Sequence, residues 1–507
     1  MRRDREHHRL FPLLARRARL SEDRALMLEI YLVCAPGLET LLAAESRALG
    51  LRVRSTEAGG VTVDGGLRDV VRANIGLRTA SRVLVRVASF RVTAFHELER
   101  SARRIAWERF VGAAPVRVRA TCRKSKLYHS DAVAERVLGA IQRVTGTGDA
   151  PDPGERAAPR ETRAPAKEGK SAKPAKGASD SRFIPAKPTA AAKTVAARAA
   201  AKQGIASAAA KASTRAANEA ANEATANEAA VKARTLAPDR TAQDAGDARE
   251  EADEGAGAQL VVVRLFRDEC TISIDSSGAL LHRRGYRQAT AKAPLRETLA
   301  AAMLLGADWR GDTPLVDPLC GAGTIPIEAA LVARRIAPGR ARAERGDFAI
   351  ASWPELPAGE IEQALSEFRG NELASARVPI VGSDRDAGAI EASVANAERA
   401  GVAADVHFVQ RVLSAAEPVG DAAGLLIANP PYGVRLSEGA DVRNIYAQLG
   451  KVAHFAFPDW RVGLLSPDRA LESQTRLPLR QAFETTNGGI RVRYLVAVPT
   501  PGPELAE

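Results

Sequence analysis

Short apolar runs alternate with amphipathic segments in the first part of the chain. They predict strands at residues 28–35, 51–55, 61–63 and 82–89, and helices at residues 38–50, 67–77 and 94–105. After Pro115, a further strand leads into a basic loop and then a helix, for which Ser130 is the expected N-cap residue, with Asp131 in the first turn. Residues 28–145 are therefore expected to form a small α+β module.

A second patterned block covers residues 258–507. It opens with QLVVVRLFRDECTISID, which predicts a β-hairpin. From about Pro294 onward, apolar strands alternate with helices, and the strands at residues 314–316, 378–382 and 424–428 each end in a polar loop that contains glycine or proline. This alternation predicts a doubly wound, Rossmann-like parallel sheet of the α/β class, in which ligands bind at the carboxyl ends of the strands.

Between the two blocks, residues 146–257 carry almost no aromatic or large aliphatic side chains. Such a composition buries too little apolar surface to offset the entropy lost on ordering, so we predict a long disordered linker. A solvated spacer is the favoured role, and nonspecific binding of nucleic acid by its Lys and Arg residues is the alternative. Residues 1–27 are expected to be a disordered basic extension or the product of a misplaced start codon.

Charge and composition narrow the range of partners. Lys and Arg number 73 against 61 Asp and Glu, and the formal net charge of +12 favours nucleic acid, unless a basic tail or linker carries the surplus without function. The four cysteines are scattered without the spacing of a zinc site, and no apolar run is long enough to span a membrane. We expect a cytoplasmic protein with no metal and no membrane partner.

The loop after the first strand of the parallel sheet reads DPLCGAGT, residues 317–324. Gly321 and Gly323 allow the backbone to approach a ligand closely, and Asp317 at the strand tip can receive a cationic or hydroxylated group. A lone G-x-G often marks only a tight turn. Pro326 and the missing third glycine distinguish this loop from the G-x-G-x-x-G of dinucleotide sites, which argues against a pyrophosphate ligand.

The next strand leads into a second acidic loop, SDRD, at residues 383–386. Asp384 at this strand tip can accept hydrogen bonds from both hydroxyls of a ribose. Taken alone, Asp384 is equally well explained as a helix cap. Paired with the preceding loop, it indicates a nucleoside site.

A third loop, NPPYG at residues 429–433, directly follows an apolar strand. Asn-Pro-Pro makes a rigid turn in any protein, which is the structural alternative. The chemical interpretation is a receptor for a planar aminated base: the Asn429 side-chain oxygen and the Pro430 carbonyl each accept a hydrogen bond from one NH2 group, and Tyr432 stacks on the ring.

Such a receptor explains how a poor nucleophile reacts. The lone pair of an exocyclic amine is delocalised into the base, so the amine attacks a methyl sulfonium slowly in water. Two acceptors that hold its hydrogens favour a more tetrahedral nitrogen and stabilise the growing positive charge. Leaving the base stack costs a few kcal/mol, which aromatic stacking of about 1–3 kcal/mol helps to offset.

DPLCGAG, SDRD and NPPYG, in that order, resemble class I S-adenosylmethionine-dependent methyltransferases that act on amines. Residues 281–305 and 485–496 resemble the guanine-N2 methyltransferases of large-subunit ribosomal RNA that carry an N-terminal THUMP domain. Residues 28–145 resemble the ferredoxin-like and THUMP portions of the same enzymes. The fold implied is a Rossmann-like methyltransferase domain preceded by an α+β RNA-binding module. Some relatives are fused to a second methyltransferase, and we expect one activity here.

The resemblance implies a role for each motif residue. The cofactor S-adenosylmethionine would be held by Lys292, Pro294, Asp317, Cys320, Gly321, Gly323, Thr324 and Asp384. The target guanine would be held by the catalytic residues Asn429, Pro430, Pro431 and Tyr432. THUMP domains bind structured RNA, so the candidate RNA contacts, unless they form a merely solvated loop, are Arg123, Lys124, Lys126, Tyr128 and His129.

One departure concerns the cofactor adenine. The family usually has an acidic residue after the fourth strand, where this chain has Gln410 and Arg411, and the side-chain oxygen of Gln410 can substitute as the acceptor. We expect methylation of guanine N2 in 23S ribosomal RNA during assembly, with either 23S ribosomal RNA or a pre-ribosomal particle as the partner. The rivals are guanine-N2 methylation of transfer RNA, adenine-N6 methylation of DNA, which the THUMP-like half argues against, and a noncatalytic RNA-binding assembly factor.

Overall fold

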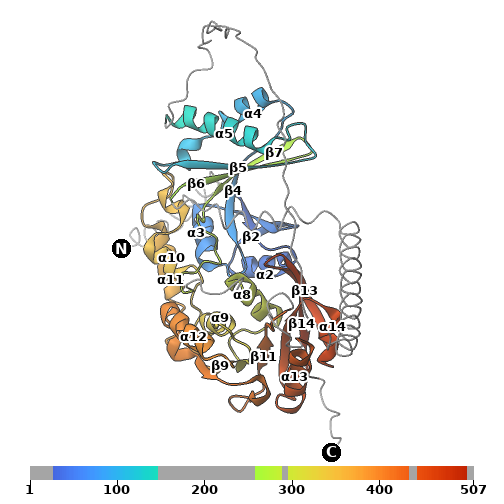
Figure 1. Ribbon diagram of the computed structural model, residues 1–507. Helices are drawn as coiled ribbons and strands as arrows, with labels where there is room; N and C mark the ends of the chain where they lie inside the picture. The colour runs from blue at the N-terminus through green and yellow to red at the C-terminus, as the bar shows by residue number, and fades with distance from the viewer. Residues whose placement is uncertain (1–26, 147–256, 288–294, 433–441, 500–507) are drawn as a thin grey trace, which may run out of the picture. The chain divides into compact units, whose positions relative to one another are not determined.

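The computed structural model describes residues 27–146, 257–287, 295–432 and 442–499. Two sheets carry the described part of the chain (Figure 1). Lys292 and Pro294, which were expected to contact the cofactor, lie outside the described residues, as do most of the predicted basic extension and most of the predicted linker.

The first sheet is built mainly from the N-terminal block. Its strands are β1 (Leu28–Val33), β2 (Arg52–Glu57), β3 (Gly60–Gly65), β4 (Arg82–Arg91), β5 (Val116–Arg123), β6 (Gln259–Phe266) and β7 (Glu269–Asp275). They lie in the order β2-β3-β1-β4-β7-β6-β5. The helices of this part are α2 (Glu39–Ala48), α3 (Leu67–Gly76), α4 (Phe95–Ala102) and α5 (Ser130–Thr145). The predicted strands and helices of this block are therefore all present, with ends shifted by a few residues.

The β6–β7 hairpin corrects the expected domain boundary. We expected it to open the methyltransferase module at residue 258, but β7 pairs with β4 and β6 pairs with β5, so the hairpin completes the first sheet. The β5–β6 pairing is parallel, with Val118 opposite Val261. A strand pattern predicts which face is buried and not which edge the strand joins, so the sequence could not show this partner.

The second sheet holds the strands of the C-terminal block. They are β8 (Leu315–Asp317), β9 (Ile380–Asp384), β10 (His407–Gln410), β11 (Leu425–Ala428), β12 (Arg461–Ser466), β13 (Arg480–Asn487) and β14 (Ile490–Ala497). Their order is β10-β9-β8-β11-β12-β14-β13. The helices are α8 (Glu297–Gly306), α9 (Thr324–Ala333), α10 (Arg340–Arg345), α11 (Glu360–Arg369), α12 (Ala387–Ala400), α13 (Val442–Phe455) and α14 (Arg469–Gln474).

The strand order explains where a ligand would bind in the second sheet. The run β10-β9-β8-β11-β12 is parallel, and β13 and β14 add an antiparallel edge. From β8 the chain proceeds outward through β9 and β10, and it then returns to place β11 on the other side of β8. This reversal is the switch point at which open α/β sheets leave a crevice beyond the carboxyl ends of their strands.

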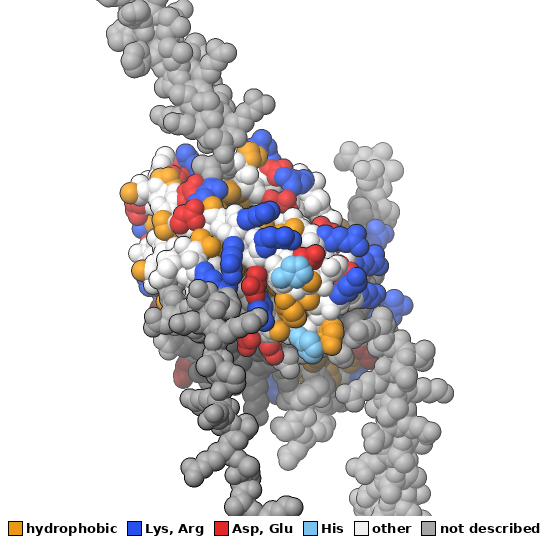
Figure 2. All heavy atoms as spheres, turned by 90° about the horizontal axis from the view of Figure 1, so that it is seen from above, with side chains coloured by type: hydrophobic (Ala, Val, Ile, Leu, Met, Phe, Trp, Pro, Cys, Tyr) orange, Lys and Arg blue, Asp and Glu red, His pale blue; other side chains and the backbone are white. Residues whose placement is uncertain are grey.

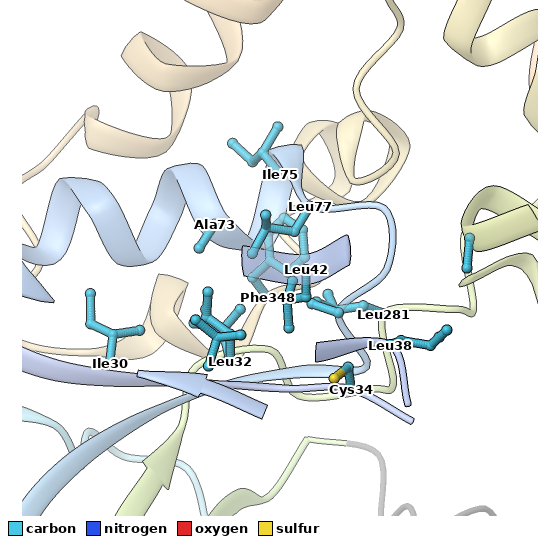
Figure 3. Packing of buried hydrophobic residues seen from close by; sticks show 14 of the residues in the cluster. Ile30, Leu32, Cys34, Leu38, Leu42, Ala73, Ile75, Leu77, Leu281 and Phe348 are labelled. Carbon is cyan, nitrogen blue, oxygen red and sulfur yellow. The ribbon is translucent and has the colours of Figure 1, made fainter. Parts of the chain in front are cut away.

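Buried side chains from distant parts of the sequence share one core. Ile30 and Leu32 of β1 pack with Leu42 of α2, and Leu281 and Phe348, from the part of the chain after residue 257, join the same cluster (Figure 3). All five side chains are at most 3% exposed. The first sheet and the segment that follows β7 are therefore stabilised by the same hydrophobic contacts.

A buried ion pair lies next to this core. The Arg284 guanidinium donates a hydrogen bond to Glu328 at 2.9 Å, and the Tyr286 hydroxyl donates to the same carboxylate oxygen at 3.0 Å. A second nitrogen of Arg284 donates to the Arg78 carbonyl at 2.8 Å. These contacts compensate charges that water does not reach.

Replacing Glu328 with Ala should lower the free energy of unfolding by about 3–5 kcal/mol, because the Arg284 charge would stay buried without its partner. Urea denaturation measures the change. Glu344→Ala is the matched control, since Glu344 pairs with Arg340 and Arg369 on the surface and should contribute no more than about 1 kcal/mol. Equal losses in the two variants would contradict the assignment of a buried pair.

Candidate active site

The predicted site residues gather at the carboxyl ends of three neighbouring strands. Asp317 ends β8, Asp384 ends β9, and Asn429 directly follows β11. Asp317 lies opposite Gly382 in the β8–β9 ladder, and β8 pairs with β11 on its other side. The motifs are 45 or more residues apart in sequence, but the fold brings them to one edge at the switch point.

The glycine loop and the second acidic loop are bonded to each other. The Gly321 amide donates a hydrogen bond to the Asp384 carboxylate at 3.1 Å, and the Cys320 amide donates to the Ser383 carbonyl at 3.0 Å. The helix cap that was considered for Asp384 is instead Asp386, whose carboxylate accepts from the Gly388 amide at the start of α12. Asp384 is thus free of a capping role and holds the glycine loop in position.

Two polar residues of α12 support the glycine loop and were missed in the sequence. The Ser393 hydroxyl donates to the Gly321 carbonyl at 2.7 Å, and the Asn396 amide donates to the Ala322 carbonyl at 2.9 Å. Both side chains are buried, at 0% and 3% exposure. Their spacing of three residues, which places them on one face of a helix, was the only available signal.

Asp317 presents an unpaired acceptor inside the protein. One carboxylate oxygen accepts from the Leu319 amide at 3.1 Å, and the other is buried with no hydrogen-bond partner among the described residues. Burial raises the pKa of this carboxyl to about 8, and the negative charge of Asp384 adds to the rise. A cationic or hydrogen-bonding ligand group would relieve this cost, so Asp317 fits the predicted cofactor contact.

The space around the two glycines differs. A Cβ atom on Gly323 would lie 3.0 Å from both Phe408 and Ser393, whereas one on Gly321 would meet nothing within 4 Å. Both residues have positive φ, 52° at Gly321 and 80° at Gly323. Gly323 therefore serves packing of the loop, and Gly321 borders open space in which a ligand can approach the backbone.

Gly323→Ala should lower the free energy of unfolding by about 2 kcal/mol, because it adds a close contact to the cost of a left-handed residue. Gly321→Ala is the matched variant and should cost about 1 kcal/mol, from conformation alone. Urea titrations of both proteins measure the difference. A larger loss at Gly321 would contradict the distinction between a packing glycine and a ligand-facing glycine.

The remaining cofactor candidates lie around the same loop. Cys320 is 7% exposed, burial raises the pKa of its thiol, and Thr324 is the buried first residue of α9. Gln410 ends β10 and is exposed, and its side-chain nitrogen donates to the Arg385 carbonyl at 3.1 Å. Arg411 forms an ion pair with Glu417 at 2.6 Å. Of these two residues, Gln410 has a side-chain oxygen that can accept a hydrogen bond, whereas the side chain of Arg411 has no acceptor.

The NPPY loop presents a second unpaired acceptor. The side-chain oxygen of Asn429 is buried and has no hydrogen-bond partner among the described residues. Pro430 is buried and Pro431 is partly exposed. Tyr432 is 4% exposed, and its hydroxyl accepts a hydrogen bond from the Asn487 side-chain amide. Asn487, which sequence reasoning did not single out, lies at the end of β13, 55 residues away.

The predicted RNA contacts lie on an exposed loop at the end of β5. Arg123, Lys124 and Lys126 are exposed, Tyr128 is 69% exposed, and its ring centroid lies 4.1 Å from that of His129.

The expected N-cap is shifted by one residue: α5 starts at Ser130, and His129 occupies the cap position without a side-chain hydrogen bond. The helix therefore begins one residue before the position that capping chemistry favours.

The turn between β6 and β7, which comes after residues 146–257 in the sequence, forms hydrogen bonds with this loop. The Arg267 amide donates to the Arg123 carbonyl at 3.2 Å, and the Lys126 amide donates to the Asp268 carboxylate at 2.7 Å. Lys124, Arg267 and Asp268 have positive φ values of 51°, 53° and 67°. Lys and Arg side chains gather on this side of the molecule in the view from above (Figure 2). Arg267 and the 39% exposed Phe266 extend the candidate surface beyond the predicted residues.

Among the residues that the structure describes, no helix combines the length and apolarity needed to cross a membrane. In the same residues, no three side chains of His, Cys, Asp or Glu are grouped as metal ligands would be.

Comparisons with known proteins match both halves of the chain. Residues 284–495 match the family described as RMKL-like, methyltransferase domain, and residues 29–84 match the RlmL ferredoxin-like domain. The Synechocystis protein slr0064, named as a candidate RNA methyltransferase, is 35% identical over 231 residues, which are 46% of this chain and 59% of slr0064. Ribosomal RNA large subunit methyltransferase K/L of Syntrophotalea carbinolica is 38% identical over 243 residues, 46% of this chain and 34% of that protein.

The chain thus spans 59% of slr0064 and about a third of the K/L protein. Among solved structures, SMU.472 in complex with SAH superposes with a TM-score of 0.66 at 22% identity and covers 94% of this chain and 99% of that one. This likeness confirms the predicted fold class, a Rossmann-like domain preceded by a ferredoxin-like α+β module. Residues 284–495 are thus similar to the RMKL-like methyltransferase domain, and residues 29–84 are similar to the RlmL ferredoxin-like domain.

Proposed function

We propose that this protein is an S-adenosylmethionine-dependent RNA methyltransferase that modifies the N2 amine of a guanine in 23S ribosomal RNA. The buried, unpaired oxygen of Asn429 carries the proposal, because it lies one strand away from the equally unpaired oxygen of Asp317. Two unsatisfied acceptors at one switch point are costly unless ligands donate to them. A cofactor at one and an amine at the other meet that requirement.

The cofactor half rests on the β8 and β9 loops. S-adenosylmethionine supplies an electrophilic methyl group on a sulfonium. Asp317 accepts a hydrogen bond from the methionine end, and the open side of Gly321 admits the ligand to the backbone. Asp384 would hold the ribose, as the family resemblance implies. SMU.472, which shares the fold, was solved with the demethylated cofactor SAH.

The amine half rests on the NPPY loop. The side-chain oxygen of Asn429 and the Pro430 carbonyl each accept a hydrogen bond from one N–H of the amine. These two bonds direct the lone pair of the nitrogen away from the ring. Because Asn429 Oδ1 is already buried, it needs little reorganisation when positive charge grows on the nitrogen. The target base stacks on the ring of Tyr432, a side chain that is 4% exposed. This chemistry requires no metal and no strong base.

The identity of the base and of the RNA rests on similarity. The K/L relatives are named as methyltransferases of the large ribosomal subunit RNA. The resemblance of residues 281–305 and 485–496 to guanine-N2 enzymes selects guanine among aminated bases. The exposed loop pair at residues 123–129 and 266–268 adds a basic surface for the RNA backbone, in the place expected for the THUMP-like part.

Replacing Lys124, Lys126 and Arg267 together with Ala should weaken RNA binding and flatten its salt dependence. Each lost phosphate contact reduces the slope of log K against log salt by about 0.7–0.9. Filter binding at salt concentrations from about 50 to about 200 mM measures the slope. Lys451→Ala, on the exposed side of α13, is the control. Equal slopes for wild type and triple variant would contradict this RNA surface.

One assay tests the proposal as a whole. The protein is incubated with methyl-labelled S-adenosylmethionine and, in turn, with unmodified ribosomal RNA, transfer RNA and DNA. Label in ribosomal RNA supports the proposal, and label in transfer RNA or DNA alone overturns the substrate. Absence of label from all three, with cofactor binding retained, favours a noncatalytic RNA-binding assembly factor.

A further inference from the structure

The tip of the β13–β14 hairpin lies on the same edge of the sheet as the candidate active site. β14 runs antiparallel to β12, and Arg493 lies opposite Ser466, the last residue of β12. The hairpin continues for three more residues to Ile490, which pairs with Asn487. At about 3.3 Å per residue, the tip projects about 10 Å beyond the end of β12. Asn487 thus reaches the level of Tyr432.

The turn fixes the position of Asn487. Gly488 and Gly489 follow it with φ of 58° and 81°, the two successive left-handed residues of a tight type I′ turn. Asn487 is 4% exposed, and its side-chain nitrogen donates to the Tyr432 hydroxyl. A buried amide at a two-residue turn has little freedom, so this bond orients the tyrosine ring.

The base of the hairpin is held by other elements. Gly37, in the turn between β1 and α2, has φ of 92°, and a Cβ there would lie 1.7 Å from the Glu484 carbonyl oxygen. A Cβ on Gly306 of α8 would lie 2.9 Å from Phe483. Backbone of the ferredoxin-like part and of α8 therefore packs directly against β13, which limits movement of the strand that carries Asn487.

We propose that Asn487 is a positioning residue of the active site, which acts through Tyr432 and makes the hairpin tip a fixed wall of the pocket for the target base. This inference rests on the proposed function, because a stacked base is the reason for Tyr432 to need a fixed orientation. The hydrogen bond from Asn487 restricts the orientation of the Tyr432 ring, and its loss should let the ring sample orientations that stack less well on the base.

The test of the bond does not depend on activity. The full-length protein is labelled with 3-fluorotyrosine at its six tyrosines, and Tyr432→Phe identifies the fluorine resonance of Tyr432. Asn487→Leu, which keeps the volume and loses the donor, should shift or broaden that resonance and no other. Gln481→Leu, on an exposed position of the same strand, should leave it unchanged. An unmoved Tyr432 resonance in Asn487→Leu overturns the inference.

Kinetics test the consequence for the reaction. Asn487→Leu should lower kcat by about tenfold and leave the KM for S-adenosylmethionine within about twofold, as expected for loss of one hydrogen bond that orients a group. Asn487→Gln, which retains an amide donor, should recover part of the loss. Tyr432→Phe removes the hydroxyl that accepts this hydrogen bond, and it replaces Asn487→Leu as the test if that variant does not fold. The double variant should lose no more than the single variants.

The two proposals fail in different ways. If the wild-type protein transfers no label to RNA, the proposed function is wrong. The fluorine shift still decides whether Asn487 orients Tyr432. A normal wild-type activity with unchanged kcat in Asn487→Leu overturns the positioning role alone. Additive losses in the double variant also overturn it, because they would show that the two side chains act independently.

Discussion

Asn429→Ala lowers kcat for methyl transfer by about 100- to 1,000-fold and leaves the affinities for cofactor and RNA within about twofold. The side-chain oxygen of Asn429 is buried and unpaired, so its hydrogen bond to the amine strengthens as charge develops on the nitrogen. A preorganised polar group of this kind typically contributes a factor of about 100 to 1,000 to the rate. The proposed RNA-binding surface at residues 123–129 and 266–268 is untouched by the change.

Single-turnover kinetics with saturating cofactor measure this loss. Asn429→Asp retains an acceptor oxygen and should be faster than the Ala variant. Asn371→Ala, whose exposed side chain caps the end of α11 by donating to the Glu367 carbonyl, is the control for loss of an asparagine elsewhere. A variant that lost RNA affinity in proportion to activity would show that Asn429 contributes to binding and not to the transfer step.

Asp317→Asn should weaken cofactor binding by about 10- to 100-fold and make the free protein more stable. Burial raises the pKa of the Asp317 carboxyl to about 8 in the folded protein, whereas an unfolded Asp has a pKa of about 3.9. Between these values the folded chain binds the proton and the unfolded chain does not. The stabilisation due to this group is therefore full below about pH 4 and lost as pH rises to about 8.

Thermal unfolding and calorimetry separate the two effects. The Tm advantage of Asp317→Asn over wild type should grow from pH 5 to pH 8 and level off above that. Cofactor affinity of the wild type should fall as pH drops below about 8, because the carboxyl must lose its proton to receive a cationic group, and the Asn variant should not follow that trend. A pH-independent difference in Tm would contradict the raised pKa.

The residues at the strand ends could be predicted because each belongs to a short local pattern. Asp317, Asp384 and Asn429 each terminate an apolar run, and parallel strands in a doubly wound sheet bring such ends together. The sequence therefore identified the edge of the sheet and the acceptors on it. The alternative of a helix cap at Asp384 could not be decided from sequence, because Asp386, two residues later, has the same capping chemistry.

Supporting residues were missed because they depend on long-range pairing. Asn487 reaches Tyr432 only because β14 joins β12 in antiparallel register, and Arg267 reaches the β5 loop only because β6 adds to the first sheet. Strand periodicity contains no information about these partners. The same limit explains why the β6–β7 hairpin was assigned to the wrong module.

The proposed activity is methylation of the exocyclic amine of a guanine in large-subunit ribosomal RNA. The most direct measurement is to incubate unmodified 23S ribosomal RNA with the protein and methyl-labelled S-adenosylmethionine, digest the RNA to nucleosides and identify the labelled one by mass spectrometry. We expect N2-methylguanosine with the wild-type protein and almost none with Asn429→Ala. Label in any other nucleoside, or equal label with the Asn429 variant, would contradict it.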